Sequence, residues 1–95
     1  MMFSDAFMAI ADPNRRYLLE ELRRGPKTVN ELAAGLPVSR PAVSQHLKVL
    51  LDAGLVNAKP EGTRRVYTVS SAGFLKLNIW LDQFWEAEQL GSPGS

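Results

Sequence analysis

The chain has 95 residues, 45% of them hydrophobic, which is enough for one compact domain with a small core. It has no cysteine and one histidine, so disulfides, thiolate metal ligands and redox sensing are excluded, and a lone histidine cannot furnish a zinc site. The net charge of +1 conceals a basic middle third, because residues 38–70 carry five basic and two acidic side chains, which favours a nucleic-acid partner there.

The N-terminal segment is predicted to form two helices. Apolar residues at 3–10 indicate a first short helix. Asp12 is a favourable N-cap, and Pro13 suits the first helical position because its missing N–H needs no partner there. A second helix is therefore predicted over residues 13–24, where a Gly-Pro pair stops it.

Two further helices are predicted on either side of a tight turn. Thr28 and Glu31 have the spacing of a capping box, so a short helix begins there and ends near Gly35. Ser39 is the expected N-cap of the next helix, and Gly54 is expected to end it. The apolar stripe of that helix recurs at helical spacing and predicts one buried face, formed by Val43, Leu47 and Leu50.

After this helix the residue pattern changes to that of a β-hairpin. Residues 55–59 and 64–69 are predicted as its strands, joined by a turn at residues 60–63. The helical period returns over residues 71–89. Residues 91–95 have linker composition, as expected of a flexible tail of the kind that expression vectors add.

The order of these elements predicts the fold class. Two short helices joined by a turn and followed at once by a hairpin are typical of a winged helix-turn-helix. We therefore expect residues 1–90 to form a single DNA-binding and dimerisation domain, mainly α with a small β-hairpin. Its terminal helices are expected to form a dimer interface.

The helix that starts after Ser39 is the predicted recognition helix. With its apolar stripe turned inward, Pro41, Ser44, Gln45 and Lys48 fall on the outer face. Glutamine can pair with adenine in the major groove, whereas basic side chains suit phosphates. Two alternatives stay open: whether His46 contacts phosphate or packs in the core, and which wing arginine enters the minor groove. The candidate DNA-binding residues are Ser39, Arg40, Pro41, Ala42, Ser44, Gln45, His46, Lys48, Arg64 and Arg65.

Aromatic and aliphatic side chains near both ends of the chain predict a second copy of the protein as a partner. A domain of this size has too little interior for them, and monomers rarely expose large apolar patches. The alternative is that the last helix folds back over its own domain. The candidate dimer-interface residues are Phe3, Phe7, Ile10, Phe74, Leu77, Trp80, Leu81, Phe84 and Trp85.

Four stretches together resemble one known family. They are DPNRR at 12–16, TVNELA at 28–33, VSRPAVSQHLKVLLDAGLV at 38–56 and GTRRVY at 62–67. Over about residues 3–88 the chain resembles the ArsR-type winged-helix repressors. The resemblance implies a homodimer with terminal helices at the interface. It also implies repression by occupying a promoter operator, often the protein's own.

The resemblance does not extend to the metal sensors of that family. Where the sensors carry cysteines, this chain has VNELA at 29–33, and its last helix offers Asp82, Glu86 and Glu88 but no histidine. Zinc-type selectivity needs softer or imidazole donors, so no metal site is expected. The segment DQFW at 82–85 resembles the metal-independent branch instead.

These observations predict a sequence-specific, double-stranded DNA-binding transcriptional regulator, acting as a homodimeric repressor or autorepressor. No phosphate-binding loop, nucleophile motif or metal cluster is present, so neither an enzyme nor a cofactor is expected. The sequence has no membrane-spanning apolar run and no secretory leader, so we expect a cytoplasmic protein without a membrane partner. Two alternatives remain: a winged-helix module for protein contact, and a repressor released by a small-molecule inducer bound near Phe7, Trp80 and Phe84.

Overall fold

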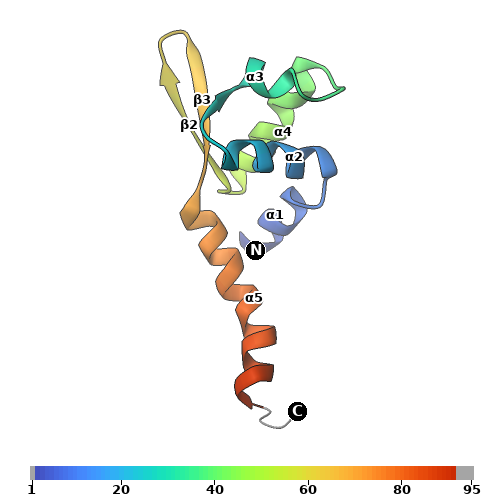
Figure 1. The fold of residues 1–95 in the computed structure, drawn as a ribbon, viewed down its shortest axis with the longest axis vertical. Helices are drawn as coiled ribbons and strands as arrows, with labels where there is room; N and C mark the ends of the chain where they lie inside the picture. The colour runs from blue at the N-terminus through green and yellow to red at the C-terminus, as the bar shows by residue number, and fades with distance from the viewer. Residues whose placement is uncertain (1, 92–95) are drawn as a thin grey trace.

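The computed structural model describes the backbone of residues 2–91 and the side chains of residues 5–85. Four helices and a small sheet form the body, and the last helix extends away from it (Figure 1). Of the predicted tail at residues 91–95, Gly91 is the last residue of helix α5 instead, and residues 92–95 lie outside the described residues. The elements are α1 (Met2–Ala9), α2 (Pro13–Arg23), β1 (Lys27–Thr28), α3 (Val29–Ala33), α4 (Arg40–Asp52), β2 (Val56–Glu61), β3 (Arg64–Val69) and α5 (Ser71–Gly91).

The predicted helix starts are confirmed by their side-chain caps. Asp12 accepts hydrogen bonds from the backbone N–H groups of Asn14 and Arg15 at 2.7 and 3.2 Å. Thr28 and Glu31 form the reciprocal capping box at the start of α3. Ser39 Oγ accepts from the backbone of Ala42 at 3.2 Å and so starts α4. Each cap satisfies an N–H that the helix itself leaves unpaired.

The sheet has three strands rather than the two that the sequence predicted. Its order is β1-β3-β2, and both pairings are antiparallel. The two-residue strand β1 pairs Lys27 with Tyr67 and Thr28 with Val66. It ties the start of the helix-turn-helix unit to the wing hairpin, formed by β2 and β3.

The turn prediction at residues 60–63 is wrong for its first two residues. Pro60 and Glu61 belong to β2, where they pair with Arg65 and Arg64. The order of the sheet makes β2 an edge strand, and an edge strand tolerates a proline because its outward N–H needs no partner. The connection is a two-residue loop whose first residue, Gly62, has φ +66°, a conformation that glycine adopts without steric cost.

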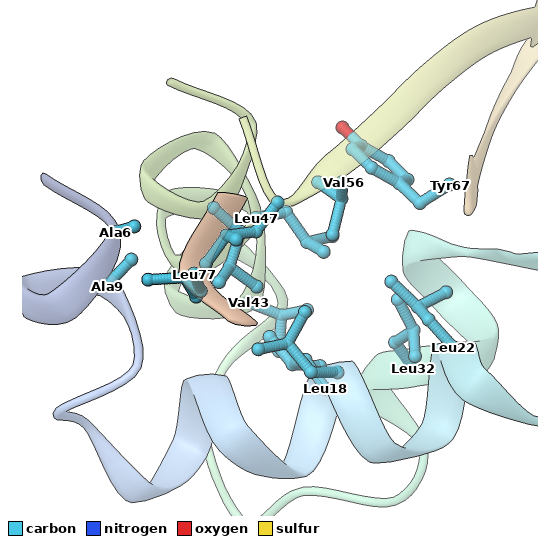
Figure 2. Close-up of a cluster of buried hydrophobic side chains, with 13 residues drawn as sticks. Ala6, Ala9, Leu18, Leu22, Leu32, Val43, Leu47, Val56, Tyr67 and Leu77 are labelled. Atoms are coloured by element: carbon cyan, nitrogen blue, oxygen red, sulfur yellow. The ribbon is translucent and has the colours of Figure 1, made fainter. Parts of the chain in front are cut away.

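The core lies where α2, α3 and α4 meet the sheet (Figure 2). The predicted buried stripe of α4 is confirmed, since Val43, Leu47 and Leu50 are fully buried. They pack with Leu18 from α2 and Leu32 from α3. Because one face of α4 is fixed in this core, the opposite face is held toward solvent.

Helix α5 packs against the body through its first half, where Phe74 and Leu77 join the core. Leu77 is 5% exposed and lies beside Ala9 of α1 (Figure 2). Farther along, Phe84 and Trp85 are 62% and 54% exposed, so the alternative that α5 folds back over its own domain is wrong for this part. Within residues 2–91, none of the helices has the length and apolar character needed to span a bilayer.

Candidate nucleic-acid interface

A concave groove of about 450 Å³ separates α4 from the wing hairpin. Residues of α3, of α4 and of the wing hairpin line this groove. Four of them are basic, and Val29, Leu51 and Tyr67 also belong to the lining. The lining residues are Thr28, Val29, Asn30, Arg40, Ser44, Lys48, Leu51, Thr63, Arg64, Arg65 and Tyr67. The fold therefore gathers five of the predicted DNA-binding residues around one groove.

The outer face of α4 matches the sequence prediction. Pro41, Ser44, Gln45 and Lys48 are exposed, whereas Ala42 is half-buried. Ser44 and Lys48 also line the groove, and Gln45 lies next to them on the helix. An exposed helix with short and amide side chains on one face has the form needed to enter a major groove.

Arg40 is held in place by a residue that the sequence reasoning missed. Its Nε donates a hydrogen bond to Oδ1 of Asn30, which lies on α3. The bond joins the two helices of the helix-turn-helix unit through their exposed surfaces and keeps the guanidinium at the rim of the groove. No local sequence signal links these two positions, because they meet only through the crossing of α3 and α4.

Lys48 forms an ion pair on α4 itself. Its Nζ lies 3.2 Å from Oδ2 of Asp52, one turn further along the helix. Both side chains are exposed, and an exposed pair of this kind contributes only a few tenths of a kcal/mol. Exchanging this carboxylate for a phosphate therefore costs little.

The two wing arginines have different neighbours. Arg65 places its guanidinium carbon 5.7 Å from the centroid of the Tyr67 ring, within the range of a cation–π contact. Arg64 stands opposite Glu61 in the register of the hairpin. Both are exposed and both line the groove.

His46 is half-buried and contacts an arginine of α2. Arg15 Nη1 lies 3.3 Å from His46 Nδ1. An arginine only donates, so Nδ1 of His46 is the acceptor in this hydrogen bond. The contact with Arg15 was not anticipated from the sequence, although both residues lie in stretches that carried the resemblance.

The predicted dimer-interface residues lie on α1, directly after it at Ile10, and on α5, with different degrees of burial. Phe7 of α1 meets Trp80 edge-on at 4.9 Å between ring centroids, and Trp80 meets Phe84 at 4.7 Å. Ile10 and Phe74 are half-buried, Leu81, Phe84 and Trp85 are exposed, and Leu77 is inside the protomer core. The side chain of Phe3 lies outside the described residues.

The sequence reasoning omitted three exposed apolar residues from this region: Met8 on α1, and Leu75 and Ile79 on α5. The last two stand four residues apart, so they share a helix face. The sequence contains this spacing, but the prediction followed the aromatic residues of the same helix instead. Helix α5 is thus apolar on more than one side, a pattern found in helices that are covered by other protein.

Together, the fold and the groove define a winged helix-turn-helix DNA-binding protein. The model of the family described as "Bacterial regulatory protein, arsR family" matches residues 12–58. The chain is 56% identical over 80 residues to the HTH-type transcriptional regulator Rv2034 of Mycobacterium tuberculosis, covering 84% of this chain and 75% of that relative. The chain belongs to the arsR family of bacterial regulatory proteins, a class of transcriptional regulators and not of enzymes.

Solved structures agree with this assignment. The crystal structure of the ArsR family transcriptional regulator RHA00566 is 32% identical, with a TM-score of 0.85, and the match covers 90% of this chain and 94% of that one. The solution structure of the homodimeric winged helix-turn-helix DNA-binding domain Mb0332 from Mycobacterium bovis is 28% identical, with a TM-score of 0.73. That match covers 94% of this chain and 82% of the other.

Proposed function

We propose that this chain is a homodimeric repressor, and that it occupies a double-stranded operator in a promoter. The observation that carries the proposal is the groove between α4 and the wing, where basic side chains from both elements surround one concave surface. A helix in the major groove with a basic ribbon beside it engages bases and backbone together. Occupying the promoter then blocks transcription without any chemistry, and the protein's own promoter is the first operator to test.

The residues divide into two roles. Gln45 and Ser44 are exposed on α4 and carry the hydrogen-bonding groups that distinguish base edges in the major groove. Arg40, Lys48 and Arg65 line the groove as cations and are assigned to phosphates, which fix the position of the protein but not its sequence preference. Arg64, at the tip of the wing hairpin, also lines the groove and is assigned to phosphate as well.

The exposed apolar surface of α5 favours a homodimer in which a second copy of the chain covers this surface. Phe84 and Trp85, in the second half of α5, leave more than half of their surface open to solvent, whereas Leu77 in the first half is buried. Two-fold pairing through α1 and α5 would present two copies of α4 to half-sites about one helical turn, or roughly 34 Å, apart. The homodimeric structural relative has the same fold.

We also propose that the protein belongs to the metal-independent branch of the family. The chain has no cysteine, and its one histidine is engaged with Arg15. Among residues 5–85, no three His, Cys, Asp or Glu side chains come together in a way that could hold a metal ion. Addition of zinc, nickel or mercury salts should therefore leave operator affinity unchanged in a fluorescence-anisotropy titration, and release from DNA would contradict this branch.

The proposed function is tested with DNA chosen by the protein itself. A selection from random duplex oligonucleotides supplies the operator, and anisotropy titrations at two salt concentrations compare it with a scrambled duplex. Gln45→Ala should cost about 1–3 kcal/mol on the operator and relax its sequence preference, whereas Arg65→Ala should weaken binding to both duplexes alike. Lys59→Ala removes an exposed charge from the same hairpin but outside the groove, and should have the smaller effect.

The outcome separates the repressor from a protein-contact module. A repressor should bind its operator at least about a thousandfold better than random DNA, with strong salt dependence. Weak binding without salt dependence would favour the contact module. Equal losses on both duplexes for the Gln45 and Arg65 variants would overturn the division of roles.

A further inference from the structure

Arg15, near the start of α2, connects three helices through one guanidinium. Its Nε donates to the carbonyl oxygen of Ala9 at 2.6 Å, and its Nη2 donates to that of Met8 at 3.1 Å. Its Nη1 donates to Nδ1 of His46 at 3.3 Å. The carbonyls belong to the last turn of α1, and that of Met8 also accepts from the backbone N–H of Ala11 at 3.2 Å. The imidazole belongs to α4.

Each end of this connection leads to a different functional surface. His46 directly follows Gln45 on α4, the helix proposed to read the operator. Helix α1 carries Phe7, which packs on Trp80 of α5, within the proposed dimer face. Arg15 is therefore the hydrogen-bonding link between the DNA-reading helix and the helices that meet the second copy.

We infer that Arg15 is a positioning residue that sets the placement of α4 relative to the dimer face, and thereby the half-site spacing that the repressor accepts. The inference rests on the proposed function, that of a homodimeric DNA-binding repressor. In a two-fold dimer, any tilt of α4 against α1 is repeated in the partner, so a small change at Arg15 alters the separation of the two reading helices twice over. Arg15 itself need not touch DNA.

The chemistry of the side chain suits this role. A guanidinium is a planar fork with several fixed donors, so it can hold two carbonyls and a ring nitrogen at once. A lysine keeps the charge but offers a single flexible ammonium. The chain also supplies a matched control, because Arg16 donates to the carbonyl oxygen of Ile10 at 2.9 Å and has no hydrogen bond to α4.

The separation of the two α4 helices can be measured directly. Because the chain has no cysteine, Val49→Cys on the exposed side of α4 accepts one spin label per protomer. Pulsed electron resonance on the DNA-free dimer should give one narrow distance distribution for the parent. Adding Arg15→Met or Arg15→Lys should broaden or shift it, whereas adding Arg16→Met should not.

Operator binding provides the functional readout. The selected operator and versions with one base pair inserted or removed between half-sites are titrated with each unlabelled variant. The parent protein should prefer the selected spacing by about tenfold or more. Arg15→Lys should reduce that preference severalfold while affinity for a single half-site stays the same, and Arg16→Met should keep it. A purely structural loss would lower affinity on all duplexes together.

The outcomes separate this inference from the proposed function. Absence of a label-pair distance would mean that no dimer forms, which would overturn the proposed homodimer and the inference with it. A dimer whose distance and spacing preference survive both Arg15 substitutions would overturn the inference alone. Equal effects of the Arg15 and Arg16 variants would also overturn it, because the end of α1 rather than the link to α4 would then be responsible. If Arg15→Met does not fold, the comparison of Arg15→Lys with Arg16→Met still tests the inference.

Discussion

At the scale of single residues, Glu31 makes the stability of α3 depend on pH. Its Oε1 accepts from the backbone N–H of Thr28 at 2.8 Å and from the Thr28 hydroxyl at 3.2 Å. These hydrogen bonds favour the carboxylate and hold the pKa of Glu31 below its ordinary value of 4.5, with a smaller contribution from the positive charges of Lys27 and Arg64. The stabilisation is therefore present above that value and is lost as the pH falls through the folded pKa.

The substitution Glu31→Gln isolates this effect, because glutamine keeps an acceptor for the capping box but carries no charge. We expect the variant to have the lower free energy of unfolding near pH 7, and the difference from the parent to shrink as the pH falls through the lowered folded pKa of Glu31. Urea unfolding followed by circular dichroism measures both. Glu20→Gln removes an exposed charge from α2 and serves as the control. A difference that stays constant with pH would contradict the prediction.

At the scale of elements, α5 starts against the end of α4. A Cβ on Gly73 would overlap the carbonyl oxygen of Gly54, which is backbone and cannot move aside. Alanine favours a helix over glycine by about 1 kcal/mol, but overpacking costs about 1–3 kcal/mol. We therefore expect Gly73→Ala to lower the thermal unfolding midpoint.

The neighbouring Ala72 is exposed and supplies the control for helix propensity. Ala72→Gly should also lower the midpoint, for the opposite reason, since glycine weakens the helix. Higher stability of Gly73→Ala than of the parent would mean that the junction between α4 and α5 has room for a methyl group.

The helices could be predicted because their starts are encoded locally. Asp12 and Ser39 each bond a backbone N–H two or three residues away, so the sequence contains both partners of the cap. Strand β1 has no such local signal, because Lys27 pairs with Tyr67 on a distant strand. Pro60 was misassigned for a related reason: its local preference is for a turn, and only its position on the sheet edge makes it a strand residue.

At the scale of the whole molecule, the candidate site could be predicted only in part. Helical periodicity identifies the outward residues of α4, since one buried stripe fixes the opposite face. The groove itself depends on how the hairpin stands against α4. The hydrogen bonds that Arg40 donates to Asn30 and Arg15 donates to His46 each join different helices, and no pattern within one segment contains them.

The shape of the molecule leads to the last prediction, on the second half of α5. Phe84 is 62% exposed, outside the protomer core, so Phe84→Glu should leave the fold intact. If Phe84 lies in the dimer interface, as proposed, the new carboxylate would be buried beside apolar side chains, which is costly. We expect the dimer dissociation constant to rise at least about tenfold, corresponding to 1.4 kcal/mol, as measured by sedimentation. Operator affinity should fall with it, whereas single half-site affinity should not. Gln83→Glu adds the same charge one residue earlier and should remain dimeric; an unchanged dissociation constant for Phe84→Glu would exclude this part of α5 from the interface.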